Sequence, residues 1–488
     1  MINYLYRDRG YEWRDHSMKF FSLFKKIIIF LFIYFIYFGL CVCIYNLHQI
    51  NSVAKEAEKD ETEPLKALYA KKIQNESVCV TAKLDQALAL RCQLIDSAQS
   101  TLYISQYAIS DDDSGLIFVG KLLEAAKRGV KIKLLLNGLA TEMSITSRIP
   151  FEIFRDEKNI EVKTMGGLNL LKPWEINNVL HDKLILADDN YFLSSGKNIG
   201  NRFMLKSEDY EATYDYDLII KKDGPSSKNS LIAQGRKYFN KLWTSRYNYD
   251  RSHSSRPFTG RALNNLTNEI RKANNRHEKI LRQEILSTLD FHRINAGLLL
   301  HNPVGTLVKK PLLWKQLVRY VEESEKATIQ SPYVIISDKM KQFGKKPLPK
   351  DLTLITNSAA TSPNLFAYAG YLHQKEQLNK QMDIWEYQGD GSLHHKAVLL
   401  NQTIGAVGSF NLDSRSAFLS SENMIFIDSP GFHDQLKKIM QEYQSESLQV
   451  KNLTTYKKSE LKHRIVHPTK QKLLDLISKI IKPLDFLL

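Results

Sequence analysis

Cysteine is scarce in this sequence. The chain has four cysteines among 488 residues, and none has the paired C-x-x-C spacing of a metal site. The cysteines therefore predict no metal site, and we expect neither a metal nor a cofactor for the chemistry described below. Cys41 and Cys43 lie in an apolar run, whereas Cys79 and Cys92 lie in a segment expected to fold. The latter two form either a disulfide, if that segment is outside the cytoplasm, or two buried thiols.

Acidic residues are outnumbered by basic ones. The chain has 53 Asp and Glu against 68 Lys and Arg, which gives a formal net charge of +15. A basic surface suits a phosphate-bearing partner, either nucleic acid or anionic lipid, and charge alone does not choose between them. The remaining composition, 43% hydrophobic and 25% charged, is ordinary for a globular protein. The length suffices for two or three domains, or for one large duplicated domain.

One long hydrophobic run is present at residues 27–44, which are 18 apolar residues without a charge. With its neighbours this run reaches the roughly 20 residues of a membrane-spanning helix. A cleaved signal peptide is the alternative, but the best cleavage-like site, at 52–54, lies well beyond the run. We expect an uncleaved anchor.

The charges that flank this run predict its orientation. Residues 1–26 carry six Lys or Arg, whereas residues 45–63 carry two lysines and five acidic residues. The positive-inside rule then places the N-terminus in the cytoplasm and the rest of the chain outside. For a Gram-negative bacterium, this predicts a single-pass protein of the inner membrane with its catalytic domain in the periplasm.

A histidine pattern occurs twice, 213 residues apart. In both copies a lysine follows the histidine by two residues and an asparagine follows it by 17: His181, Lys183 and Asn198, then His394, Lys396 and Asn411. Each motif is predicted on a strand, where residues two apart share one face. A single H-x-K is usually an accident, but two copies with the same asparagine offset indicate one active site built from two halves.

The segments around the two motifs also repeat. Residues 101–109, 116–127 and 130–136 predict a strand, a helix and a strand, which favours a parallel or mixed sheet covered by helices. Residues 327–336 and 352–356 repeat the two strands. We interpret this as an internal duplication rather than a solenoid repeat.

The paired motifs suit phosphodiester chemistry without a metal. One neutral imidazole attacks phosphorus, and the other, protonated, donates to the leaving alcohol. The two lysines and the two asparagines, with Ser409, can supply donors to the phosphate oxygens. Each histidine also needs an orienting carboxylate. The candidates are Asp215 and Glu422, with Asp209 and Asp217 as alternatives to the first.

The pattern H-x-K-x4-D-x6-G-[GS]-x-N, present twice, resembles the phospholipase D superfamily. HDKLILADDNYFLSSGKNIGNRF, YDYDLII and YFNKLW in the first half are similar to bacterial cardiolipin synthases of the C type. So are SLHHKAVLL, GSFNLDSRSAFLSSENMIFI and the ending KPLDFLL. Two positions depart from the pattern: Asn401 replaces the second Asp, and Ser195-Gly196 replaces a Gly-Gly or Gly-Ser pair. We expect the loss of an ion pair at Asn401 to reduce stability rather than activity.

This resemblance implies an α/β fold of two pseudo-symmetric phospholipase D-like halves, each a mixed β-sheet flanked by helices, with the active site between them and a transmembrane helix before them. It implies His181 as the nucleophile, His394 as the acid and base, and Asp215 and Glu422 as histidine-orienting acids. The implied reaction moves a phosphatidyl group to an alcohol, giving cardiolipin from phosphatidylglycerol and a second phospholipid.

Three other functions stay open: a phospholipase D hydrolase, a phosphodiesterase nuclease, and a non-enzymatic lipid-binding role if Asn401 marks a degenerate site. The anchor and the apolar face of residues 473–488 favour lipid over nucleic acid, although that face can equally pack on the domain. The expected organisation is a basic cytoplasmic tail, a transmembrane helix, a tether, a first half, a helical connector, a second half and an amphipathic segment, at residues 1–26, 27–46, 47–76, 77–250, 251–300, 301–450 and 451–488.

Overall fold

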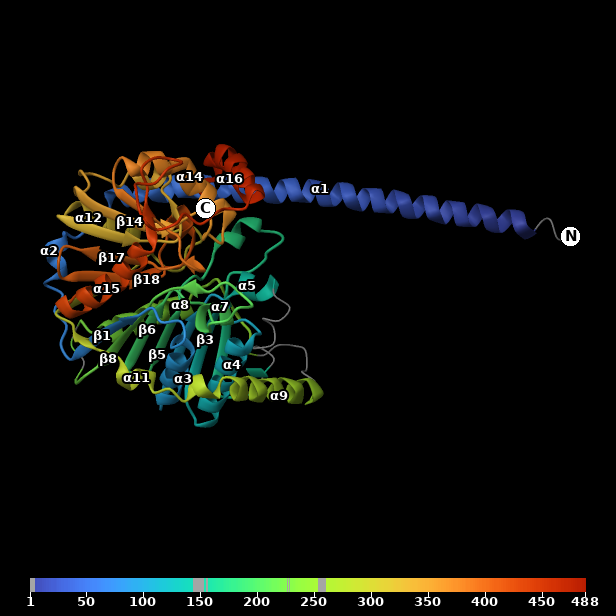
Figure 1. Ribbon diagram of the computed structural model, residues 1–488. Helices are drawn as coiled ribbons and strands as arrows, with labels where there is room; N and C mark the ends of the chain where they lie inside the picture. Colours follow the sequence, from blue (N-terminus) through green and yellow to red (C-terminus); the bar gives the residue numbers. More distant parts are fainter. Residues whose placement is uncertain (1–4, 144–152, 155–156, 226, 228, 253–259) are drawn as a thin grey trace.

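The chain forms two similar halves, each built on one mixed β-sheet, and a long helix that projects from them (Figure 1). The computed structural model describes all residues except 1–4, 144–152, 155–156, 226, 228 and 253–259. Within the described ranges, the two large sheets have nine and eight strands. The expected α/β fold of two mixed sheets flanked by helices is confirmed.

The first sheet has a parallel centre and antiparallel flanks. Its strands are β1 (Glu76–Thr81), β2 (Thr101–Gln106), β3 (Lys131–Asn137), β4 (Ile160–Met165), β5 (Leu184–Ala187), β6 (Tyr191–Ser195), β8 (Asp217–Lys222), β9 (Asn248–Asp250) and β10 (His292–Arg293). They lie in the order β10-β1-β8-β6-β5-β2-β3-β4-β9, and β2, β3 and β4 run parallel. The predicted strand–helix–strand unit is present, with α4 (Asp113–Lys127) between β2 and β3.

The second sheet repeats this plan. Its strands are β11 (Ala296–His301), β12 (Lys326–Gln330), β14 (Asp351–Asn357), β15 (Asp383–Tyr387), β17 (Ala397–Leu400), β18 (Ile404–Gly408), β20 (Asn423–Asp428) and β21 (Ser447–Gln449). They lie in the order β11-β20-β18-β17-β12-β14-β15-β21, and β12, β14 and β15 run parallel. The order β20-β18-β17-β12-β14-β15 matches β8-β6-β5-β2-β3-β4, as a duplication requires.

Helices cover the sheets and fill the space between them. The remaining helices are α1 (Leu5–Lys59), α2 (Leu65–Leu68), α3 (Ala87–Ser97), α5 (Gly138–Met143), α7 (Asn201–Met204), α8 (Leu231–Trp243), α9 (Gly260–Arg276), α10 (Glu278–Leu281), α11 (Ile285–Thr288), α12 (Leu312–Glu322), α13 (Asp338–Lys341), α14 (Leu365–Asn379), α15 (Pro430–Ser445) and α16 (Pro468–Ile480), with short turns η2 (Pro173–Asn177), η3 (Arg415–Leu419) and η4 (Lys482–Leu484). Buried residues of α8 and α15 join strands of both sheets in one core, such as Phe239 and Phe432. This shared core fixes the halves relative to each other.

The histidine motifs do not lie on strands, contrary to the prediction. His181–Lys183 precede β5 and His394–Lys396 precede β17, in extended segments outside the ladders. The physical reason is that both segments leave their own sheet and pair with the other half. Leu180 forms a bridge with Ser421, and β16 (Ser392–Leu393) pairs in parallel with β7 (Thr213–Tyr214).

The helix α1 contains a span long and apolar enough to cross a membrane, with a mean hydropathy of 2.9. Residues 47–76, expected as a tether, are helical as far as Lys59, and the side chains of Ile50, Ala54 and Ala57 are buried against the second half. The ammonium of Lys315 on α12 donates to the carbonyls of Ala57 and Glu58. These contacts cap the end of the helix and dock it.

The segments that join and follow the halves are helical in part. The connector 251–300 holds α9, α10 and α11, which pack on the first half, but its last strand, β11, belongs to the second sheet. In α16, Leu474 and Ile477 are buried, whereas Leu476 and Ile480 are exposed, so the helix packs on the domain with one face only.

Cys79 and Cys92 are buried free thiols, which decides between the two alternatives for this pair. Burial raises the pKa of Cys79 to about 11 and that of Cys92 to about 12. Both thiols are therefore protonated and unreactive at neutral pH.

Asp188 and Asn401 occupy equivalent turns, after β5 and β17, and both have a left-handed backbone (φ 48° and 54°). The carboxylate of Asp188 accepts the backbone N–H groups of Gln99, Ser100 and Thr101 at 2.7–2.9 Å. The amide oxygen of Asn401 accepts only that of Glu325, at 2.9 Å. The expectation of a lost ion pair is wrong, because Asp188 binds backbone donors here rather than a cation.

This difference predicts unequal costs for alanine at the two turns. Asp188→Ala should lower the free energy of unfolding by about 2 kcal/mol, and Asn401→Ala by about 1 kcal/mol, because the first removes three capped donors and the second removes one. Urea denaturation of the two variants, read by circular dichroism, measures both values. Equal decreases in the free energy of unfolding would contradict the conclusion that Asp188 caps more backbone donors than Asn401.

Candidate active site

The two histidines face one cavity between the halves. It has a volume of about 530 Å³, and its lining includes His181, Asn198, His394, Asn411 and Glu422. Backbone hydrogen bonds between the two halves hold the histidines at the cavity. The N–H of His181 donates to the carbonyl of Ser421 at 3.1 Å, and that of His394 donates to Tyr214 at 2.7 Å.

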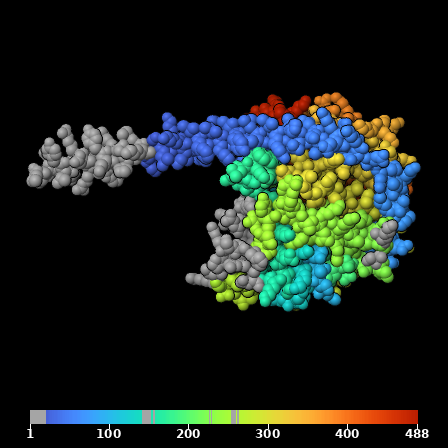
Figure 2. Space-filling view, turned by 180° about the vertical axis from the view of Figure 1, so that it is seen from behind, coloured from blue at the N-terminus to red at the C-terminus, as the bar shows by residue number. Residues whose placement is uncertain are grey.

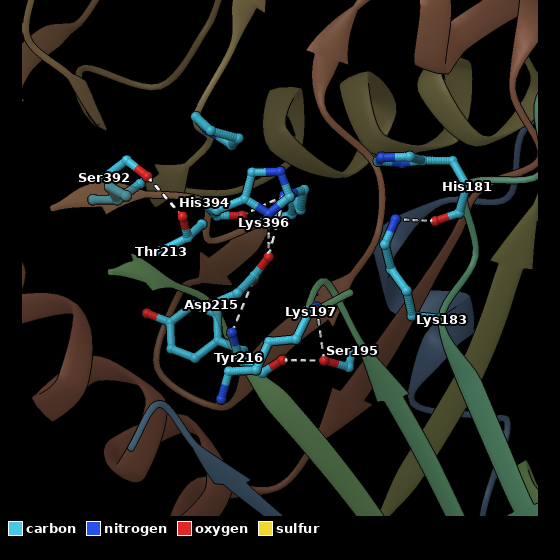
Figure 3. A network of polar contacts seen from close by, with 12 residues as sticks. His181, Lys183, Ser195, Lys197, Thr213, Asp215, Tyr216, Ser392, His394 and Lys396 are labelled. Carbon is cyan, nitrogen blue, oxygen red and sulfur yellow. Dashed lines mark hydrogen bonds and ion pairs between the residues drawn. The ribbon is translucent and has the colours of Figure 1, made fainter. Parts of the chain in front are cut away.

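Each histidine is held by a carboxylate from the opposite half. Nδ1 of His394 lies 2.6 Å from Oδ2 of Asp215, and Nδ1 of His181 lies 2.9 Å from Oε1 of Glu422. Figure 3 shows Asp215 pointing at His394, with His181 on a separate segment across the site. Nδ1 of His394 is hydrogen-bonded to Asp215, which leaves Nε2 to face a substrate. In His181 the contact to Glu422 is close but is not aligned as a hydrogen bond.

The choice among the candidate aspartates is settled by their contacts. Asp217 pairs with Arg91 at 2.8 Å and with Lys197 at 2.7 Å, and all three side chains are fully buried. Asp209 is exposed and contacts Ser207. Asp215 therefore serves His394, while Asp217 neutralises two buried cations.

The two motif lysines are buried beside their histidines. Lys396 Nζ lies 2.7 Å from His394 Nδ1 and 3.2 Å from Asp215. Lys183 Nζ donates to the carbonyl of His181 at 2.5 Å. Burial lowers the pKa of both lysines, that of Lys183 to about 7.

The histidines and their carboxylates are electrostatically matched. Burial and the adjacent lysines lower the pKa of both histidines, that of His394 to about 3. Burial opposes ionisation of Asp215, but Lys396 and His394 hold its pKa well below the usual range. Burial raises the pKa of Glu422 to about 7. At neutral pH both imidazoles are therefore neutral and competent as nucleophiles or bases before a phosphate enters.

The predicted amide and hydroxyl donors fall into two groups. Asn198 and Asn411 line the cavity, and within the described residues their side-chain oxygens have no hydrogen-bond partner. Ser409 is fully buried, where its Oγ accepts the N–H of Asn423 at 3.1 Å and supports the Glu422 carboxylate. Ser409 is not among the residues that line the cavity, so a direct contact with a phosphate stays a prediction.

Comparison with known proteins agrees with this geometry. Residues 91–243 and 324–444, more than half of the chain, match the family described as cardiolipin synthase, PLD-like domain. The chain belongs to this family. It is thus a phospholipase D-like enzyme, and the two matched segments correspond to its two sheets.

Individual relatives of this phospholipase D-like enzyme are distant. An uncharacterized protein of Helicobacter pylori strain 26695 is 26% identical over 445 residues, 79% of this chain and 84% of the relative. Cardiolipin synthase C of Escherichia coli K12 is 24% identical over 400 residues, 70% of this chain and 79% of the relative. The crystal structure of phosphatidylserine synthase from Haemophilus influenzae Rd KW20 has a TM-score of 0.61 at 16% identity, over 89% of this chain and 100% of that one. This last likeness concerns the fold.

Two arginines of the phospholipase D-like site were missed by the sequence analysis. Arg202 and Arg415 both line the cavity, and each follows a motif asparagine by four residues. That shared offset is the signal that could have found them. Arg202 is held by Thr213 Oγ1 at 2.8 and 3.0 Å, and Arg415 contacts the carbonyl of Leu487 at 3.3 Å. Both bring positive charge to the cavity, which favours an anionic ligand.

The buried Asp217 cluster predicts an acid limit to stability. Arg91 and Lys197 lower the pKa of Asp217 from 3.8 to about 2, against the opposing effect of burial. Since the folded-state pKa lies below the ordinary one, this stabilisation is complete above about pH 4 and is lost as pH falls towards 2. Asp217→Asn should cost about 3–5 kcal/mol at pH 7, because it leaves two buried cations unpaired.

Thermal unfolding between pH 2 and 7 measures this effect. The difference in melting temperature between the original chain and Asp217→Asn should shrink at the acid end. Asp209→Asn is the matched control, since that exposed carboxylate should leave the melting temperature unchanged. A constant difference down to pH 2 would contradict the assignment.

Proposed function

We propose that this enzyme transfers a phosphatidyl group between phospholipids and thereby makes cardiolipin, through a phosphohistidine on His181. One observation carries the proposal: two histidines from opposite halves face one cavity, each with a carboxylate oxygen close to Nδ1, at 2.9 Å for His181 and 2.6 Å for His394. Nucleophile and proton donor must stand on opposite sides of phosphorus for an in-line displacement, and a two-half site supplies that arrangement.

In the first step, Nε2 of His181 attacks phosphorus as the P–O bond to the donor head group breaks. His394, once protonated, gives its proton to the leaving alkoxide. In the second step, neutral His394 takes the proton of the acceptor hydroxyl, whose oxygen attacks phosphorus and displaces His181. Asp215 stabilises the protonated form of His394 on each cycle.

The phosphate charge is balanced by side chains of both halves. Asn198, Asn411 and the two cavity arginines supply donors to the non-bridging oxygens, and the buried lysines supply positive charge behind the histidines. Entry of the anionic phosphate raises the pKa of His394, so that the acid form becomes available when substrate is bound.

The cavity favours an alcohol over water as the acceptor. Its wall includes Leu139, Ile335, Ala367, Leu487 and Leu488, which are apolar. An apolar wall excludes water and accommodates lipid glycerol and the start of an acyl chain. Phosphatidylglycerol, which carries free hydroxyls, fits as acceptor, with a second phospholipid as donor.

Lipid analysis of bacteria that lack cardiolipin synthases tests the overall reaction. The original chain should restore cardiolipin, and His181→Ala or His394→Ala should not, with a loss of at least about a thousandfold. Phosphatidic acid in place of cardiolipin would show hydrolysis instead. Cardiolipin that survives either substitution would refute the two-histidine mechanism.

A phosphatidyl ester of p-nitrophenol separates the roles of the two histidines. Nitrophenolate leaves without a proton, so His394→Ala should release one equivalent per enzyme in a burst and then stall as a phosphohistidine. His181→Ala, which has lost the nucleophile, should give no burst. A burst from His181→Ala and none from His394→Ala would make His394 the nucleophile and His181 the acid and base.

We also propose that α1 anchors the enzyme in the bacterial inner membrane, with the N-terminus in the cytoplasm and both halves in the periplasm. The asymmetry of basic residues around residues 27–44 supports this orientation. Lys66→Cys, on an exposed position of α2, should react with a membrane-impermeant maleimide once the outer membrane is permeabilised. Reaction only after lysis would place the halves in the cytoplasm.

A further inference from the structure

The loop before η2 presents three leucines to the surroundings. Leu168, Leu170 and Leu171 are 50%, 59% and 83% exposed. We propose that this leucine loop, residues 168–171, inserts into the bilayer beside α1 and guides membrane phospholipid to the cavity. The second clause rests on the proposed function, whereas the insertion requires only that α1 spans the membrane.

Hydrogen bonds fix the leucine loop against the apolar part of α1. The hydroxyl of Tyr34 donates to the carbonyl of Leu170 at 2.8 Å, and that of Tyr37 reaches the carbonyl of Leu171 at 3.5 Å. Both tyrosines lie inside the apolar run 27–44. If that run is in lipid, a loop bound to it is in lipid as well.

An aromatic pair marks how deep the leucine loop reaches. Tyr45, at the end of the apolar run, stacks on Trp174 of η2 with ring centroids 5.1 Å apart. Tyrosine and tryptophan prefer the boundary between lipid and water. Tyr37 and Tyr34 precede Tyr45 by eight and eleven residues, or about 12 and 17 Å of helix. One leaflet of the hydrocarbon core is about 15 Å thick, so the loop reaches through one leaflet to about the middle of the bilayer.

Several backbone groups of the leucine loop have partners within the protein, as lipid requires. Oδ1 of Asn169 accepts the N–H groups of Leu171 and Lys172, both at 3.1 Å. Nδ2 of Asn169 donates to Glu175 at 2.9 Å, at the base of the loop. With the tyrosine bonds to two carbonyls, these contacts replace water, which a bilayer does not offer.

The leucine loop leads directly into the cavity wall. After it come η2, then Val179, which lines the cavity, and then His181. Figure 2 shows this segment, in blue-green, as a bulge directly beneath α1 where the helix leaves the body. The leucine loop is therefore joined to His181 by ten residues of chain, and one of these, Val179, lines the cavity.

Fluorescence quenching in vesicles tests the insertion. Leu171→Cys is introduced into the full chain with Cys41→Ala and Cys43→Ala, labelled with bimane, and reconstituted in vesicles of phosphatidylglycerol and phosphatidylethanolamine. The buried Cys79 and Cys92 stay unlabelled, because burial raises the pKa of their thiols to about 11 and about 12. Nitroxide on the acyl chains should quench this label, and aqueous iodide should not.

Two matched labels make the outcome decisive. Lys66→Cys, exposed on α2, should be quenched by iodide alone, and Leu31→Cys, in the apolar run, by nitroxide alone. Iodide quenching at Leu171 as strong as at Lys66 overturns the proposal. Protection from both quenchers also overturns it, since protein, from a second copy or a partner, would then cover the loop. If Leu31→Cys itself is quenched by iodide, α1 is not inserted and the proposal fails with it.

The guiding role is tested by comparing substrates. Leu170→Ser with Leu171→Ser should lower turnover of vesicle phospholipid about tenfold, because the loop loses its preference for lipid, and should keep turnover of a monomeric short-chain phospholipid. An equal loss of turnover on both substrates would mean that the leucines have a structural role, and it would overturn the proposal that the loop guides phospholipid to the cavity. Absence of all phospholipid turnover in the original chain would reject the proposed function and leave the quenching result intact.

Discussion

Each motif histidine lies within 3 Å of a carboxylate that belongs to the other half of the chain, at 2.6 Å for His394 and 2.9 Å for His181. The pairs His394 with Asp215 and His181 with Glu422 lie where backbone segments also cross between the halves. The site therefore exists only when both halves are folded and docked. The shared core that includes α8 and α15 stabilises the docking of the two halves. The carboxylates of Asp215 and Glu422 orient the two imidazole rings.

Burial sets the chemistry of the site as much as the residue types do. The histidines, lysines and acids lie in a poorly solvated interior, where each charge depends on its partner. Asp215 stays ionised because Lys396 and His394 are beside it, whereas Glu422 keeps a pKa of about 7. The two halves are thus alike in sequence pattern and unlike in protonation, which fits two histidines with different tasks.

Much of the fold and the motif residues could be predicted from the sequence, because they depend on local patterns. The strand–helix–strand unit of the first half, the repeat of its two strands in the second half, and the spacing of His181, Lys183 and Asn198 needed no tertiary information. The pairing of each carboxylate with the opposite histidine could not be predicted, since it depends on how the halves dock. Asp215 and Asp217 are two residues apart, and only the positions of Arg91 and Lys197 separate their roles. The burial of Ser409, whose Oγ accepts the N–H of Asn423, likewise depends on tertiary packing that its spacing does not show.

The docking of α1 has a consequence for biosynthesis. The end of this helix is capped by Lys315, which follows Ala57 by 258 residues. At about 5–20 residues per second, roughly 13–50 s pass between synthesis of the two partners. During that time the apolar helix is already available to the membrane, while the surface that receives its last turns has not been made. If α1 spans a membrane as proposed, the membrane segment is set in place first, and the body of the enzyme is assembled afterwards against a helix that is already fixed.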